Sequence, residues 1–253
     1  MGLIRSLVIY WRPGRQRGLR RLYSAFVGPG DLVFDVGAHL GDRTAAFSSL
    51  GANVVALEPQ PDVLPWLRRL VGQRPGVTIR PEAVGRESGS AQLAVSEATP
   101  TLSTLASDWK DRMPQDNPTF QHVRWERSIE VAVTTLDMLI ECHGEPRFCK
   151  IDVEGHEAEV LAGLTRPIEA LSMEFVAGSL DVAIACVHRL EHLDSYRYNV
   201  ISGERRRFVL SEWAGADEIT SWLREGADGV SSGDLYARRT DAHTEQPSPD
   251  SEG

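Results

Sequence analysis

The chain has 253 residues, 42% of them hydrophobic, and a formal net charge of −9 at pH 7. This length fits one α/β domain with extensions, and the acidic balance argues against a nucleic acid as the main substrate. The three cysteines form no Cys-x-x-Cys pair and no uninterrupted apolar run approaches membrane-spanning length, so no disulfide framework, zinc site or transmembrane segment is indicated and a cytoplasmic location is predicted.

Residues 1–29 form a basic N-terminal extension, in which six arginines precede the first acidic residue, Asp31. Three interpretations compete: an arginine-rich transit segment, a helix on a membrane surface, and a helical cap packed over a sheet. We favour the cap, because the helical spacing of the apolar residues continues directly to the first predicted strand.

Residues 32–36 are a short, β-branched apolar run that stops at a glycine, which is typical of a buried parallel strand. Gly37 and Gly41 then bracket a tight turn, and a helical pattern begins near Thr44. Strand, glycine loop and helix together indicate the first crossover of a doubly wound α/β fold. In such folds the ligand binds beyond the carboxyl ends of the strands.

The glycine loop does not fit a dinucleotide. That fingerprint needs a glycine where this chain has His39, and Asp35 at the strand end would repel a pyrophosphate. A carboxylate there suits a cation, such as the α-ammonium group of a methionine. The pattern formed by Asp35, Gly37, Ala38 and Gly41 resembles motif I of the class I S-adenosylmethionine (AdoMet) methyltransferases.

A second acidic residue supports this interpretation. The next predicted strand, residues 53–57, ends at Glu58, 23 positions after Asp35, and Pro59 fixes the following turn. An acidic residue about 20 positions along, at the tip of the second strand, is placed to bind ribose hydroxyls. The alternative, a solvated loop charge, is the weaker interpretation.

The middle of the chain is predicted to hold a helix over residues 63–71 and strands over 76–79, 92–95 and 128–133. In the class I fold the loop after the third strand borders the adenine, so Glu82 and Ala83 are candidate adenine contacts. Residues 97–127 have weak periodicity, three prolines and several aromatic residues. They are either a lid over the site or a surface insertion with locally buried aromatics, and the pattern leaves both open.

Residues 147–164 are the second informative stretch, in which a strand ends at Asp152 and a helix begins near Gly155. Residues 168–175 are the next predicted strand, ending near Glu174, and residues 234–237 are a last, antiparallel strand. Residues 30–239 are therefore expected to form one α/β domain, a doubly wound, mostly parallel seven-stranded sheet with helices on both faces. Residues 240–253 are polar and acidic and are expected to be a disordered tail.

Five sequence blocks occur in one order and together resemble the FkbM family of AdoMet-dependent methyltransferases. They are Asp35-Val36-Gly37-Ala38 with Gly41, Leu57-Glu58-Pro59, Ala83-Val84-Gly85, Leu136-Asp137, and Lys150-Ile151-Asp152-Val153-Glu154-Gly155 with Glu157. The resemblance implies AdoMet as cofactor and O-methylation of a small-molecule hydroxyl, often on a sugar or a secondary metabolite. The expected cofactor contacts are Asp35, Gly37, Ala38, His39, Gly41, Thr44, Glu58, Pro59, Glu82 and Ala83.

The acceptor is expected beyond the ends of the first, fourth and fifth parallel strands, where Asp152, Glu154, Glu174 and His156 are the candidate catalytic residues. Converging carboxylates can act as base and orienter or hold Mg²⁺ against a diol, and helix capping is the ordinary alternative. No metal-binding motif accompanies them, so no metal site is assigned. We place the base at Glu154, one step past the strand end.

Two other functions remain as alternatives. One is a protein that binds AdoMet without turnover. The other is a nicotinamide-dependent oxidoreductase, which conflicts with His39 in the glycine loop.

Overall fold

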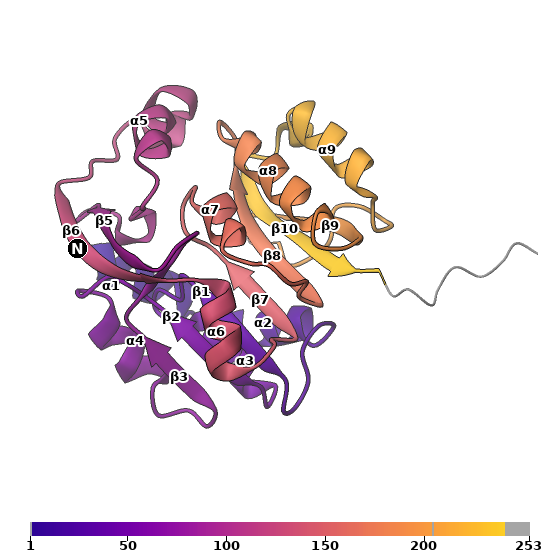
Figure 1. The fold of residues 1–253 in the computed structure, drawn as a ribbon. Helices are drawn as coiled ribbons and strands as arrows, with labels where there is room; N and C mark the ends of the chain where they lie inside the picture. Colours follow the sequence, from indigo (N-terminus) through magenta and orange to yellow (C-terminus); the bar gives the residue numbers. More distant parts are fainter. Residues whose placement is uncertain (1, 204, 241–253) are drawn as a thin grey trace, which may run out of the picture.

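The computed structural model describes residues 2–203 and 205–240, with side chains from Ser6 onward (Figure 1). Its main sheet has seven strands in the order β3-β2-β1-β7-β8-β10-β9. All neighbouring pairs are parallel except those of β10, which runs antiparallel to β8 and β9. The strands are β1 (Leu32–Val36), β2 (Asn53–Leu57), β3 (Val77–Arg80), β7 (Phe148–Ile151), β8 (Ala170–Val176), β9 (Tyr196–Ser202) and β10 (Ser232–Arg239). The predicted doubly wound fold is confirmed.

Helices cover both faces of this sheet. On one face Phe34 and Val36 of β1 join the larger apolar cluster with α6 (Leu136–His143), α7 (Glu157–Ala162), α8 (Leu180–Glu191) and α9 (Ala216–Arg224). On the other face Val33 packs among residues of α2 (Arg15–Tyr23) and α3 (Asp42–Ser49), and α4 (Leu64–Val71) lies beside them. Alternate residues of β1 thus face opposite layers, as the period of a strand requires.

A second, smaller sheet has the order β4-β6-β5. It consists of β4 (Ala83–Val84), β5 (Gly89–Val95) and β6 (Arg127–Thr134), and β5 pairs with β6 in antiparallel register. The strands predicted at residues 92–95 and 128–133 therefore pair with each other, outside the main sheet.

The connection between β5 and β6 holds η1 (Pro100–Leu102), α5 (Ser107–Asp116) and η2 (Pro118–Phe120), and Figure 1 shows α5 standing beyond the end of the sheet. Trp109, Met113, Phe120 and Val123 bury one another here and pack against Val176 of β8. The aromatic residues of this segment form a local core that rests on the main sheet through one strand end.

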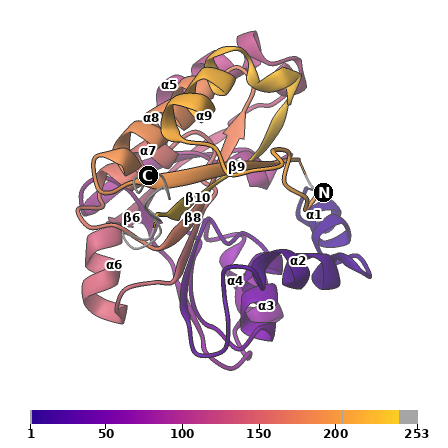
Figure 2. The same ribbon diagram turned by 90° about the vertical axis from the view of Figure 1, so that its right-hand side faces the viewer.

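The N-terminal residues form α1 (Gly2–Tyr10) and α2, and α2 lies directly against α3 in Figure 2. Leu19 and Tyr23 of α2 are buried with Phe47 and Phe148 against the face of the sheet. Within the described residues, no helix is both long and apolar enough to cross a membrane. The acidic tail predicted at 240–253 lies, apart from Thr240, outside the described part of the chain.

Candidate active site

A cavity lies at the carboxyl ends of β1, β2, β7 and β8, where the doubly wound fold places its ligands. It encloses about 990 Å³, part of which is open to solvent. Residues from the glycine loop, from the end of β2 and from the turn after β7 line it, and Thr101, Ser103 and Leu105 line it from the segment between β5 and β6.

The glycine loop is pinned to both neighbouring strands. The backbone N–H groups of Gly37 and Ala38 both donate to the carbonyl oxygen of Leu57, at 3.1 and 2.9 Å. Gly37 has φ +79°, and a Cβ at this position would lie 1.8 Å from the carbonyl oxygen of Asp152. Glycine is therefore required, because the loop passes too close to the end of β7 for any side chain.

Glu58 closes the far side of the loop. It is 2% exposed, and its carboxylate accepts the N–H of His39 at 2.9 Å and the N–H of Gln60 at 2.8 Å. Burial raises the pKa of Glu58 to about 7, although the two backbone donors oppose the shift. Glu58 lines the cavity, so an oriented carboxylate stands where ribose hydroxyls are expected.

His39 adopts the left-handed conformation, with φ 47°, and its ring meets the ring of Tyr10 edge to face at 5.7 Å. Its Nε2 atom is buried and has no hydrogen-bond partner among the described residues. Burial lowers the pKa of His39 to about 4, so the ring is neutral at neutral pH. A neutral, unpartnered ring nitrogen on the cavity wall is available to a ligand.

Three of the predicted cofactor residues lie behind the cavity wall. Asp35 is fully buried and accepts a hydrogen bond from the Thr44 hydroxyl at 2.5 Å. Gly41 packs against Leu67 and Val71 of α4. Burial raises the pKa of Asp35. The other seven predicted cofactor residues line the cavity: Gly37, Ala38, His39, Glu58, Pro59, Glu82 and Ala83.

Two residues that the sequence patterns did not single out tie the cofactor side to the segment between β5 and β6. Gln60 donates from Nε2 to the carbonyl oxygen of Pro100 at 3.0 Å, and Ser103 donates to the Gln60 side-chain oxygen at 2.9 Å. Both residues are buried and both line the cavity. The sequence could have indicated Gln60, because it follows the candidate ribose ligand Glu58 by two positions. Nothing in the sequence indicated Ser103.

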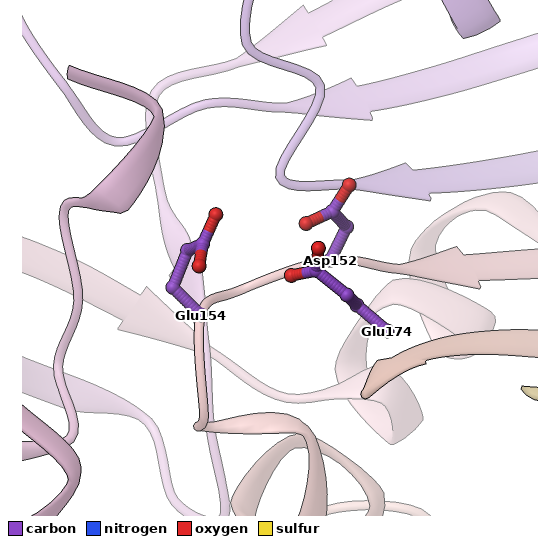
Figure 3. A group of neighbouring side chains, drawn as sticks. All are labelled: Asp152, Glu154 and Glu174. Atoms are coloured by element: carbon purple, nitrogen blue, oxygen red, sulfur yellow. The ribbon is translucent and has the colours of Figure 1, made fainter. Parts of the chain in front are cut away.

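Three of the four predicted catalytic residues converge. One carboxylate oxygen from each of Asp152, Glu154 and Glu174 lies within 4.8 Å of the others, and Figure 3 shows the three side chains around one space. Asp152 follows β7 and Glu174 lies in the neighbouring β8, so the sheet topology brings them together. We call these three residues the carboxylate cluster.

Lys150, a residue that the sequence patterns did not select, neutralises one member of the cluster. Its ammonium group is 1% exposed and donates to Asp152 at 2.7 Å. Burial opposes ionisation of Asp152, but Lys150 and Arg43 outweigh it and lower the pKa of Asp152 to about 2. Asp152 is therefore a carboxylate at every working pH.

Among the described residues, neither Glu154 nor Glu174 forms an ion pair, and the charge of Lys150 only partly offsets the rise in the pKa of Glu154. Glu154 is 8% exposed, has φ 55°, and its carboxylate accepts no hydrogen bond within the part of the chain that the structure describes. The buried Oε2 of Glu174 likewise has no hydrogen-bond partner among those residues. Burial, and then the charge of Asp152, raises the pKa of both groups well above the ordinary value. These two carboxyls have a high affinity for a proton or a cation.

The segment between β5 and β6 holds the backbone of Glu154 in place. The Thr104 hydroxyl donates to the carbonyl oxygen of Glu154 at 2.6 Å. The Trp109 ring covers Gly155 so closely that a Cβ there would lie 2.3 Å from Trp109 Cδ1. On the other side, Glu157 accepts the N–H groups of Val153 and Gly155. The left-handed turn that presents Glu154 is thus fixed from both sides.

His156 also lines the cavity, just before α7, and burial lowers the pKa of its ring. It lies beside Gly85 and is not one of the three residues of the carboxylate cluster. His156 is thus a second candidate base, with a neutral ring, and it lines the cavity outside the carboxylate cluster.

Comparison with known proteins agrees with this geometry. The model of the methyltransferase FkbM domain matches residues 35–228. Hexuronic acid methyltransferase AglP of Haloferax volcanii is 31% identical over 179 residues, which cover 68% of this chain and 67% of that protein. Ribosomal RNA small subunit methyltransferase A of Rubrobacter xylanophilus is 30% identical over 115 residues, 45% of this chain and 44% of that protein.

Among solved structures, a TehB-like SAM-dependent methyltransferase from Corynebacterium glutamicum has a TM-score of 0.46 at 11% identity, with 88% of each chain covered. Fibrillarin of Aeropyrum pernix has a TM-score of 0.44 at 13% identity, covering 84% of this chain and 68% of that one. Because a family model spans most of the chain and a curated relative shares 31% identity, the protein belongs to the FkbM family of methyltransferases and uses S-adenosyl-L-methionine as its cofactor.

Proposed function

We propose that this methyltransferase transfers a methyl group to a hydroxyl oxygen of a small molecule, a sugar moiety or a secondary metabolite. The observation that carries the proposal is the pair Glu154 and Glu174, two enclosed carboxyls beside the cofactor cavity with high proton affinity. A hydroxyl acceptor must lose a proton as its oxygen is methylated, and such a group can take it. The named substrate class of the AglP relative, a hexuronic acid, supports a sugar as acceptor.

The residues of the cavity fit AdoMet. Glu58 offers oriented carboxylate oxygens for the ribose, the neutral His39 offers an unpartnered Nε2, and Ala83 and the paired Glu82 border the adenine end. When bound, AdoMet supplies a methyl group that is already activated on a sulfonium. The protein must therefore align the acceptor oxygen and remove its proton, and alignment alone contributes ~7–11 kcal/mol in favourable cases.

We assign proton removal to Glu154. Burial, and then the charge of Asp152, raises the pKa of Glu154, and in its ionised form a carboxylate with a higher proton affinity is a stronger general base. Asp152, held ionised by Lys150, and Glu174 orient the acceptor hydroxyl towards Glu154. Glu154, in its carboxylate form, would accept the proton that leaves the acceptor hydroxyl, while AdoMet would supply the methyl group to the oxygen and keep the electron pair of the broken sulfur–carbon bond.

An acceptor that is a small molecule, and not an RNA, is supported by charge. The chain carries 36 acidic and 27 basic residues, and the acceptor side of the cavity is formed by carboxylates. A polyanionic substrate would be repelled from both. The relative that is a ribosomal RNA methyltransferase aligns with less than half of this chain.

The test is a mass-shift screen of candidate glycosides with AdoMet, in which the product should gain one methyl group whose NMR signals identify an O-methyl ether. Glu154→Gln should keep AdoMet affinity and lower kcat by ~10²-fold or more, whereas Glu87→Gln, at an exposed position, should match wild type. If no acceptor is methylated, the protein binds AdoMet without turnover.

Adding EDTA separates two versions of the mechanism. Activity that EDTA abolishes and Mg²⁺ restores would assign the carboxylate cluster to a metal ion instead of a proton. If Glu154→Gln and Glu174→Gln both turn over normally, with and without EDTA, the base assignment is wrong and His156→Ala is the next variant.

A further inference from the structure

The end of α1 and the start of α2 contact the glycine loop of the cofactor site directly. The ring of Tyr10 meets the ring of His39 edge to face at 5.7 Å, and the indole N–H of Trp11 donates to the carbonyl oxygen of Leu40 at 3.2 Å. These contacts join residues about 30 positions apart in the chain. They hold His39 and Leu40, two consecutive residues of the loop.

A buried ion pair continues this contact one turn further. Arg15 is 1% exposed, and its Nε donates to the carboxylate of Asp42 at 2.6 Å. Gln16 donates to the carbonyl oxygen of Asp42 at 2.9 Å. The guanidinium of Arg15 also lies over the ring of Tyr10, 5.0 Å from its centroid. Residues 10–16 therefore behave as one unit, in which Arg15 links Tyr10 to the first residue of α3.

The glycine loop, residues 37–41, has a backbone conformation that must be stabilised by its surroundings. Gly37, His39 and Gly41 all have positive φ, and His39 is the one of the three that carries a side chain. A non-glycine residue in the left-handed region is strained and persists only where its surroundings over-determine it. Glu58 fixes the His39 backbone from the sheet side. Tyr10 and Trp11 hold the same loop through the His39 ring and the Leu40 carbonyl oxygen.

Tyr10 also reaches the cavity itself, as one of its lining residues. α1 packs beside η1, which contributes the Pro100 carbonyl that Gln60 binds. The helix thus spans the gap between the glycine loop and the segment that follows β5. The matched methyltransferase domain begins at residue 35, so all of these contacts come from outside it.

We propose that residues 10–16 are part of the cofactor site of this protein: Tyr10 closes one side of the AdoMet cavity, and Arg15 holds residues 37–42 in the conformation that binds the cofactor. Tyr10 is then a cofactor-contacting residue, and Arg15 and Trp11 are positioning residues that act through the loop. The proposal rests on the cofactor alone and is independent of the identity of the acceptor.

The test measures AdoMet binding by titration calorimetry, without any acceptor, on the full chain. Arg15→Gln and Tyr10→Ala should each raise the Kd for AdoMet at least tenfold, and Tyr10→Phe, which keeps the ring, should restore binding to within about threefold. Two controls on the same helices are Arg17→Gln and Val8→Ala, both at exposed positions, and they should stay within about twofold of wild type. In the cofactor-free protein, Arg15→Gln should also speed amide hydrogen exchange in residues 37–42.

A purely structural role predicts a different result. In that case Arg15→Gln would lower the melting temperature while the folded protein kept the wild-type Kd and loop exchange, and the proposal would be overturned. Should Arg15→Gln fail to fold, Tyr10→Ala decides, because Tyr10 is only half-buried. Wild-type binding by Tyr10→Ala contradicts the proposal. Because these binding measurements use no acceptor, they remain valid even if the methyl-transfer screen finds no substrate.

Discussion

The buried carboxyl of Glu58 makes the stability of the protein depend on pH. Burial raises the pKa of Glu58 from the ordinary 4.5 to about 7 in the folded chain, while the unfolded chain keeps the ordinary value. The folded state therefore holds the proton more tightly. The stability contributed by this group is fully present below pH 4.5 and is lost as the pH rises through about 7.

The size of the effect follows from the shift. Each pKa unit corresponds to ~1.4 kcal/mol, so the rise from 4.5 to about 7 corresponds to at most ~3.5 kcal/mol. Glu58→Gln removes the titrating group. The free energy of unfolding of the cofactor-free variant should therefore fall less than that of wild type between pH 5 and pH 8, by up to ~3 kcal/mol.

Urea unfolding at a series of pH values measures this difference directly. Glu130→Gln, at an exposed position of β6, is the matched control and should follow wild type. Glu157 is also buried, with a pKa raised to about 7. Glu58→Gln should therefore remove only part of the pH dependence of the free energy of unfolding. If wild type and Glu58→Gln differ by the same free energy at every pH, the carboxyl titrates normally and the reasoning fails.

Four further outcomes follow from the same geometry. If ionised Glu58 binds the ribose, the Kd for AdoMet should rise as the pH falls below about 7, and Glu58→Gln should bind weakly with a flat pH profile in calorimetry. Gly37→Ala should abolish AdoMet binding because its Cβ would meet the Asp152 carbonyl, whereas Gly30→Ala, with φ +85° but open space, should keep it. Asp35→Asn should weaken AdoMet binding less than Glu58→Gln does, since Asp35 lies behind the wall, and an equal or larger loss would place its carboxylate on the cofactor. Trp109→Ala should lower kcat with little change in AdoMet Kd, because Trp109 packs on Gly155 next to the base, and a selective loss of cofactor affinity would contradict this.

The main sheet was predictable because its signals are local. A parallel strand buried on both faces is a short apolar run, and β1, β2 and β7 each end at a glycine or an acidic residue in the sequence itself. The small sheet was not predictable in the same way. The pairing of β5 with β6 joins residues 89–95 to 127–133. The alternating pattern of a short strand does not indicate which other strand it pairs with.

The ionic contacts of the site show the same limit. Asp152 follows Lys150 by two residues, so the period of a strand puts both side chains on one side. The place of Lys150 opposite Asp35, in contrast, comes from the register of β1 against β7, which the sequence alone does not give. Arg15 is one of six arginines in the extension, and its side chain is buried against Asp42. Neither spacing nor composition separates Arg15 from its exposed neighbour Arg17, because the difference lies in the helix face that packs on α3.

The two halves of the site therefore differ in how they are built. The cofactor half uses the glycine loop and the end of β2, which are close in sequence and carry recognisable motifs. The acceptor half places Glu154 through Thr104 and Trp109, about 50 positions away, from a segment with its own local core. A segment whose aromatic residues form a local core of their own can vary without disturbing the main sheet. We therefore expect acceptor choice to reside in residues 97–127. Exchanging residues 106–127 between family members, which keeps the contacts of Pro100 and Ser103 with Gln60, should change the acceptor while leaving the Kd for AdoMet in place.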